Sequence, residues 1–294
     1  MRIRAHIRWA AVLLALTFTA VSAFAQDDQF LLPEQSTAKA NELLRQTIEA
    51  LGGNAYLNTK DITCTGKLSG FDHSGALTGY ETFIDYQQPP FKERQENLPK
   101  RNIISIFNGD KGWDLDRGGV SEAPRTDLAQ NKEDVKRDIF NILKNRIHEK
   151  DVVLRYGGPD IIDGWQADWV EMVDSENRTI RIAIQRSSHL PVRKTVESRD
   201  PRTRTTFTEV EYYSNYHPME GIQTPFQITR EKNQIKVFQA FFEKCDYNTG
   251  LADEMFTRES LEQRWAQVGK KEKNKKDKDI DKDSKDDKDK DDKS

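Results

Sequence analysis

The spacing of apolar residues predicts two helices in this chain. Residues 36–51 carry a helical stripe that ends at Gly52-Gly53, and Ser36 or Thr37 can cap its first turn. A second helix is expected within residues 132–147, where Asn131 can act as the cap. The apolar stripes comprise Ala40, Leu43, Leu44, Ile48 and Leu51 in the first helix, and Val135, Ile139, Ile142 and Leu143 in the second.

Most of the remaining chain alternates apolar and polar residues, as strands do when one face of their sheet is buried. Turns rich in Gly, Asn, Asp and Pro separate these runs. Because the strands do not alternate with helices, the sheet is predicted to be antiparallel. About eleven strands are predicted, in residues 61–69, 76–88, 101–108, 111–116, 150–156, 165–174, 178–186, 190–198, 204–216, 225–232 and 235–246.

Two helices are too few to cover a sheet of this size. The sheet therefore either closes into a barrel around its own core or stays a curved half-barrel with an apolar hollow. Three segments contain more apolar residues than a simple alternation requires, namely residues 165–173, 180–184 and 237–242. Most of these residues are expected to be core, and a subset would line a cavity for an acyl chain.

The first 25 residues have the parts of a cleavable export signal. Arginines precede an apolar run over residues 9–20, and the small side chains of Ala23 and Ala25 suit a signal peptidase. The run is shorter than the roughly 20 residues that span a bilayer, and no Cys lies near the cleavage point. We therefore expect cleavage between Ala25 and Gln26, and a periplasmic protein with no stable membrane anchor.

Both ends of the mature chain are predicted to lie outside the folded domain. Residues 26–35 are expected to be a flexible leader, residues 36–260 a single domain, and residues 261–294 a charged, disordered tail. From Lys270 onward the tail has no aromatic residue, so it cannot bury enough apolar surface to offset the entropy of ordering. Its spaced aspartates lack the Gly and the distal Glu of a calcium loop, which favours a solvated segment.

Charge and motifs argue against several classes of function. The chain has 46 Lys plus Arg against 49 Asp plus Glu, which disfavours nucleic acid as a partner because phosphate binding needs clustered positive charge. The His residues after the signal are scattered, so no metal site is predicted. Neither a nucleophile elbow nor a phosphate-binding glycine loop is present, and no cofactor is predicted.

The only two cysteines, Cys64 and Cys245, leave two interpretations open. In an oxidising compartment they could form a disulfide. Two buried free thiols fit the sequence equally well.

The order of several short motifs resembles that of the LolA-like periplasmic carriers, the group that sorts outer-membrane lipoproteins and has relatives that bind other lipids. The resemblance implies an incomplete antiparallel barrel, mainly β with two or three helices, in which the helices lid the concave side. The hollow would hold acyl chains during transit to the outer membrane, and no bond would be made or broken, so the protein would not be an enzyme. The matching segments are residues 49–53 (EALGG), 86–92 (YQQPPFK), 107–113 (FNGDKGW), 190–194 (LPVRK), 220–225 (EGIQTP), Tyr247-Asn248 and Met255-Phe256.

The resemblance also implies partners. These are lipid or lipoprotein acyl chains, together with transfer proteins of the inner and outer membranes, and the carrier is expected to be a monomer. One position departs from the pattern, because Gln88 stands where the proteobacterial carriers have a basic residue that helps to close the lid. Its amide can still bond to a loop, but without the strength that charge adds. A lipid-binding protein of the same fold is thus a safer expectation than a dedicated lipoprotein shuttle.

The residues of the lipid cavity are predicted from strand parity, because residues two apart share one face of a strand. The six candidates are Tyr80, Ile84, Trp169, Ile182, Tyr212 and Phe241. Two other functions stay open. One is a non-enzymatic envelope sensor or interaction module on the same fold. The other is a periplasmic hydrolase, which would need carboxylates or His with shifted pKa values gathered in a pocket.

Overall fold

The computed structural model describes residues 31–98, 103–199 and 204–267. The predicted signal sequence with its cleavage point, and residues 268–294 of the predicted tail, lie outside them. The described strands are β1 (Ile62–Phe71), β2 (Leu77–Gln88), β3 (Lys92–Leu98), β4 (Ile103–Asn108), β5 (Lys111–Asp116), β6 (Gly119–Glu122), β7 (Val153–Ile162), β8 (Trp165–Val173), β9 (Thr179–Gln185), β10 (Pro191–Arg199), β11 (Thr206–Met219), β12 (Ile222–Lys232) and β13 (Ile235–Tyr247).

These strands form one open antiparallel sheet in the order β6-β5-β4-β3-β2-β1-β13-β12-β11-β10-β9-β8-β7. The predicted fold class is confirmed, with thirteen strands in place of about eleven. The two additional strands are β3 and β6. β3 was missed because its sequence, KERQENL, has no apolar alternation, and β6 was missed because it has only 4 residues.

The helices are more numerous and differently bounded than the sequence predicts. They are α1 (Pro33–Leu51), α2 (Asn54–Leu57), α3 (Arg125–Arg137), α4 (Ile139–Lys144), the short turns η2 (Arg146–His148) and η3 (Asp253–Phe256), and a helical segment over residues 258–267. α1 begins inside the predicted leader, because Pro33 suits a first helical turn. Ser36 and Thr37 do not cap it. Instead, Ser36 Oγ accepts from Tyr156 N–H at 2.9 Å and Thr37 Oγ1 donates to the Leu154 carbonyl at 3.0 Å, which ties α1 to β7.

The second predicted helix is two helices separated at Asp138. The backbone of Asp138 is extended (φ −62°, ψ 130°), and its carboxylate accepts from the N–H of Asn141 at 2.8 Å. Asp138 is therefore the cap of α4, as short polar side chains often are. The predicted cap, Asn131, lies inside α3.

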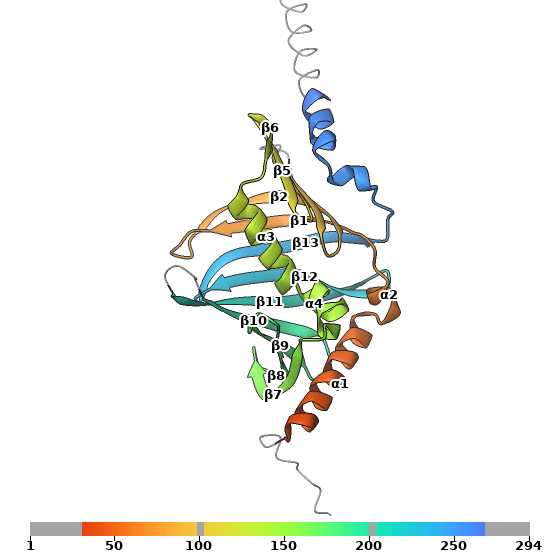
Figure 1. The fold of residues 1–294 in the computed structure, drawn as a ribbon, viewed down its shortest axis with the longest axis vertical. Coiled ribbons are helices and arrows are strands. Elements are labelled where there is room, and N and C mark those ends of the chain that lie inside the picture. The colour runs from red at the N-terminus through yellow and green to blue at the C-terminus, as the bar shows by residue number, and fades with distance from the viewer. Residues whose placement is uncertain (1–30, 99–102, 200–203, 268–294) are drawn as a thin grey trace, which may run out of the picture.

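The concave face of the sheet carries α1, α3 and α4 (Figure 1). The main core forms where α1 and α4 meet β8 and β9. Its fully packed members include Leu44, Leu51, Ile142, Leu143, Met172, Ile180 and Ile182. Cys64 and Cys245, which lie opposite each other on β1 and β13, form a disulfide at the edge of this core.

The C-terminal segment packs on the opposite, convex face. Phe256 and Leu261 are fully buried against Ile104, Ile106 and Leu115 of β4 and β5. The predicted domain boundary at residue 260 therefore cuts through a packed helical segment, and the folded part continues to residue 267.

Candidate functional site

A cavity of about 530 Å³ lies between α3 and the concave face of the sheet. A second cavity of about 180 Å³ adjoins it beneath α4. We call the two together the hollow. The residues that line both are Asp85, Gln87, Asp138, Ile139, Tyr213, Ile228 and Phe242.

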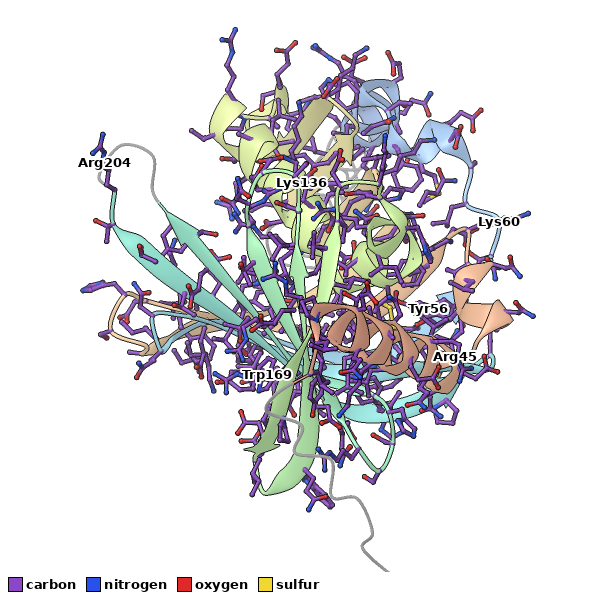
Figure 2. The ribbon with its side chains drawn as sticks, turned by 60° about the horizontal axis from the view of Figure 1, so that its bottom comes forward. Arg45, Tyr56, Lys60, Lys136, Trp169 and Arg204 are labelled. Carbon is purple, nitrogen blue, oxygen red and sulfur yellow. A yellow bond between two sulfur atoms is a disulfide. The ribbon has the colours of Figure 1, made fainter. Side chains whose placement is uncertain are left out.

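Aromatic and aliphatic side chains form one part of the wall of the hollow. Phe83 of β2 meets Phe242 of β13 edge to face, with ring centroids 5.7 Å apart. In the smaller cavity Tyr56 packs on Phe140 of α4, with ring centroids 4.7 Å apart. Tyr56 is buried, and Figure 2 shows it beside α1. The apolar residues of the larger cavity are Leu68, Phe83, Phe107, Val135, Ile139, Val196, Ile228, Phe238, Ala240 and Phe242.

Charged side chains form the other part of the wall. Seven carboxylates face the larger cavity, from Asp85, Glu93, Asp127, Asp134, Asp138, Glu209 and Glu211. The cationic residues there are Lys92, Arg137, Lys194 and Arg230. On α3, the lining residues Asp127, Gln130, Asn131 and Asp134 follow helical spacing, so one stripe of this helix presents polar groups to the hollow.

Two of the carboxylates are neutralised by ion pairs. Glu211 lies 2.6 Å from Lys194 and 2.7 Å from Arg230, and Glu209 lies 2.9 Å from Arg137. Burial alone would raise the pKa of Glu211, but the two cations outweigh it and lower the pKa to about 2. Glu211 thus stays ionised at any physiological pH.

The other carboxylates carry no ion pair among the described residues. Desolvation, with Asp138 and Asp134 as negative neighbours, raises the pKa of Glu93 to about 7. Desolvation and Glu93 raise the pKa of Asp85 well above its ordinary range. Desolvation likewise raises the pKa of Asp134 and of Asp138. The pKa of Asp138 is raised even though this residue exposes surface to the hollow. Four carboxylates therefore line one cavity, where Asp134 and Asp138 oppose the ionisation of Glu93, and Glu93 opposes that of Asp85.

The helix α3 is held over the hollow mainly by charged groups. None of its residues is buried. Its C-terminal half is tied by an ion pair between Glu133 and Arg178 and by Lys194, which donates to the Arg137 carbonyl at 2.5 Å. Its other half has the exposed pair Lys132–Asp110 at 2.6 Å. The exposed pair contributes about 0–1 kcal/mol, and α3 buries no side chain, so little apolar packing holds it to the sheet.

Solved structures with this arrangement exist, although no family model and no curated protein matches the sequence. A putative outer membrane lipoprotein-sorting protein domain from Vibrio parahaemolyticus is 11% identical, with a TM-score of 0.51 over 79% of this chain and 100% of its own. A DUF1329 family protein from Desulfovibrio piger is 13% identical, with a TM-score of 0.50 over 76% of this chain and 98% of its own. The fold is LolA-like. At these identities the likeness concerns the fold alone.

Within this LolA-like fold, none of the six predicted cavity residues lines the hollow. Tyr80 and Phe241 are exposed (74% and 40%). Trp169 is buried in a small separate cluster and lies 4.6 Å from the Arg181 guanidinium, while Tyr212 lies 5.3 Å from Arg193. Ile182 packs in the main core. Ile84 is half-buried beside the hollow-lining Phe83.

The main cause of the error is that strand parity identifies two faces without saying which is concave. Ile182 is the exception, because it lies on the concave face but packs in the main core beside the helices. Phe83, Tyr213 and Phe242, each one residue from a predicted position, line the hollow in place of Ile84, Tyr212 and Phe241. The acidic stripe of α3 was missed because that helix begins at Arg125, seven residues before the predicted range. The signal was present in the sequence as polar residues at helical spacing, Asp127, Asn131 and Asp134.

Gln88 bonds to a loop, and that loop belongs to the C-terminal segment. Its amide donates to the Leu251 carbonyl at 2.7 Å. Lys92 pairs with Asp253 at 2.6 Å, and Arg94 donates to the Met255 carbonyl at 2.9 Å. These residues of β2 and β3 therefore fasten the segment before residue 258, and no bond from Gln88 to the helix α3 is present among the described residues.

In the described ranges, no three His, Cys, Asp or Glu residues are placed to hold a metal ion. No helix in the same ranges is long and apolar enough to cross a membrane.

Proposed function

We propose that this protein is a periplasmic carrier that binds the acyl chain of a lipid or lipoprotein in the hollow, for transit to the outer membrane. The observation that carries the proposal is the hollow itself, whose larger cavity of about 530 Å³ has an aromatic and aliphatic wall. Ligand cavities of proteins are typically about 300–1,000 Å³. Each methylene that enters such a wall contributes about 0.8 kcal/mol of binding free energy.

The way α3 is held supports entry of a long chain. α3 forms the lid of the larger cavity, has no buried residue and is fastened by charged pairs. Moving it exposes little apolar surface to water, so the opening costs less free energy than moving α1, whose Ala40, Leu44 and Leu51 are buried. Cargo would enter and leave on the side of α3.

Two further observations support the location and the kind of cargo. The predicted export signal would deliver the chain to the periplasm. One of the solved structures with this fold is described as an outer membrane lipoprotein-sorting protein domain. The proposal extends that description to this chain.

A pair of variants on α3 tests the proposal. Val135 lines the hollow, and Ala129 on the same helix is exposed and does not. Val135→Trp places a large ring in part of the cavity, so we expect it to weaken binding of a fluorescent fatty acid at least about tenfold, which is about 1.4 kcal/mol. Ala129→Trp is the matched control and should bind as the original protein does. Circular dichroism checks that both variants fold.

Native mass spectrometry of the protein purified from the periplasm provides the second measurement. We expect acyl-chain molecules to copurify and to be absent from Val135→Trp. A protein that is empty in the mass spectrum and does not bind the fluorescent fatty acid would contradict the proposal. Equal binding by Val135→Trp and Ala129→Trp would place the ligand outside the hollow.

A periplasmic hydrolase is the second candidate, because the carboxylates that such an enzyme needs are present in the hollow. Glu93, with its pKa near 7, could act as a general acid at neutral pH. The test is the fate of the bound ligand. An intact ligand mass after prolonged incubation supports the carrier, whereas conversion that stops in Glu93→Gln supports the hydrolase.

A further inference from the structure

The hollow brings acidic groups of the lid opposite acidic groups of the sheet. Asp134 and Asp138 come from α3 and its end, and Asp85 and Glu93 come from β2 and β3. Their charges interact, since Asp134 and Asp138 both raise the pKa of Glu93, and Glu93 raises that of Asp85. Like charges that face each other across an enclosed space repel, which disfavours a closed lid when the space holds no positive charge.

The cations of the wall offset the charge of this group only in part. Lys194 lowers the pKa of Asp138, and Arg230 lowers those of Asp134 and Glu93, but all three pKa values remain raised. The ion pairs of these cations go to other acids. Lys194 and Arg230 pair with Glu211, and Arg137 pairs with Glu209. The fourth cation, Lys92, pairs with Asp253 of the C-terminal segment at 2.6 Å. Asp85, Glu93, Asp127, Asp134 and Asp138 are thus left without an ion pair among the described residues, and all five line the larger cavity.

One acceptor in this group has no partner at all. Oδ1 of Asp85 is buried and accepts no hydrogen bond from a described residue, while its Oδ2 accepts from the Gln87 amide at 2.6 Å. A buried acceptor without a donor is unfavourable. Asp85 lines both cavities, so its carboxylate lies at the boundary of the hollow.

The kind of donor follows from the spacing and from the surroundings. No three of these acids are placed to hold a metal ion in the described structure. The acids adjoin the rings of Phe83 and Phe242, whose faces attract organic cations. A group that is positively charged, carries several N–H donors and is attached to an apolar chain satisfies both parts of the wall.

We propose that the hollow selects an amphiphile with a protonated amine next to its acyl chain, the ammonium lying between Asp85 and Glu93 of the sheet and Asp134 and Asp138 of the lid. This inference rests on the proposed carrier function and names its cargo class. The amine would add positive charge among these acids, so binding and closure of α3 would favour each other.

The pH dependence of this selection follows from all the charged groups around the site. They are Asp85 of β2, Lys92 and Glu93 of β3, Asp127, Asp134, Arg137 and Asp138 of α3 and its end, Lys194 of β10, Glu209 and Glu211 of β11, and Arg230 of β12. With a pKa of about 7, Glu93 is mostly ionised at pH 8 and mostly protonated at pH 6. The preference for an amine should therefore weaken as the pH falls from 8 to 6.

The test compares four compounds on the purified protein at pH 8, by displacement of the neutral probe N-phenyl-1-naphthylamine. Dodecylamine, dodecanol and dodecanoate share one chain and differ in charge, and spermidine has the amines without the chain. We expect dodecylamine to bind roughly tenfold more tightly than dodecanol, because an ion pair at about 4 Å contributes one to a few kcal/mol. Dodecanoate and spermidine should bind more weakly than dodecylamine.

Two variants locate the effect. Glu93→Gln combined with Asp134→Asn should reduce the preference for dodecylamine over dodecanol to less than about threefold, since two of the facing charges are gone. Glu243→Gln, which removes an exposed acid of β13 outside the hollow, should leave it unchanged. Binding of dodecanol by the double variant shows that its hollow is intact.

The outcomes separate this inference from the proposed function. If dodecanol and dodecanoate bind but dodecylamine binds no more tightly, the amine selection is wrong and the carrier proposal stands. If none of the dodecyl compounds displaces the probe, the carrier proposal fails as well. Binding of spermidine as tight as that of dodecylamine would assign the site to free polyamines and overturn the acyl-linked class.

Discussion

The helices α1 and α3 cross the concave face of the same sheet, and they contact it in opposite ways. α1 buries Ala40, Leu44, Thr47 and Leu51, and its first turn bonds to the edge strand β7. α3 buries no residue and turns carboxylates and amides toward the sheet, with a cavity beneath it. The fold thus has a packed half, which carries the stability, and a hollow half, where a ligand can replace the missing contacts.

The contrast shows how one curved sheet can serve two purposes. A core of Ile, Leu and Met between α1 and β8–β9 gains free energy from every buried methylene. Beneath α3 the sheet presents Phe83 and Phe242 beside Asp85 and Glu93, so the same closure would bury charge. The cavity beneath α3 keeps these carboxylates from packing closely against one another.

Removal of the disulfide should have the largest effect on the packed half. Cys64 and Cys245 are separated by 181 residues in the sequence. A crosslink over so long a loop stabilises by restricting the unfolded chain, so Cys64→Ala with Cys245→Ala should lower the free energy of unfolding by about 3–5 kcal/mol. Urea unfolding of the double variant and of the oxidised protein measures this, and identical midpoints would contradict it.

Truncation of one apolar residue on each helix sharpens the comparison. Leu44 of α1 is 2% exposed, so Leu44→Ala should lower the free energy of unfolding by about 2–4 kcal/mol. Val135 of α3 is only partly buried beside a cavity, so Val135→Ala should lower it by less than about 1 kcal/mol. Thermal unfolding of both variants is the measurement. A loss for Val135→Ala as large as that for Leu44→Ala would mean that α3 is packed like α1.

Neutralisation of one carboxylate in the hollow should stabilise the protein, in contrast to both truncations. The folded pKa of Glu93, about 7, lies above its ordinary value of 4.5, so the folded state binds more protons between these values and loses stability as the pH rises through them. Glu93→Gln should therefore raise the free energy of unfolding by about 1–3 kcal/mol at pH 8 and by much less near pH 5.

The control for this experiment is Glu211→Gln. Glu211 has a folded pKa of about 2, below its ordinary value of 4.5. Its ionised form therefore stabilises the fold above pH 4.5, and this stabilisation is lost as the pH falls from 4.5 to 2. Glu211→Gln should be destabilising at pH 8, because Lys194 and Arg230 lose their partner. Urea titrations at pH 8 and pH 5 measure the sign of the change in unfolding free energy for both variants. Destabilisation of Glu93→Gln at pH 8 would show that the carboxylates of the hollow do not repel one another.

Most strands could be predicted from the sequence, and the exceptions are informative. β4 and the first half of β7 bury every second residue, an alternation that a buried face produces in any sheet. β3 is a strand in a charged sequence, because Glu93 and Gln95 face a cavity and Arg94 on its other face donates to Met255 and Ser260 in the C-terminal segment. A rule based on apolar residues fails where the function or a docked segment keeps a strand polar.

The six predicted cavity residues show the limit for the site. Period-two alternation places Ile84 and Phe83 on opposite faces, and that much was right. Both faces of β2 and β13 carry large apolar residues, because one face lines the hollow and the other is partly exposed or covered by the C-terminal segment. The number of large apolar residues on each face therefore could not show which face is concave.

The amino-acid sequence by itself determined every strand except β3 and β6, the antiparallel arrangement, the opening helix and the resemblance to LolA-like carriers, because periodicity and turn residues act over a few neighbouring positions. Only the tertiary structure decided which sheet face is concave, that α3 covers it, and that Asp85, Glu93, Asp134 and Asp138 meet in one space. The physical reason is that the direction of curvature and the approach of distant carboxylates depend on how thirteen strands pair and twist together.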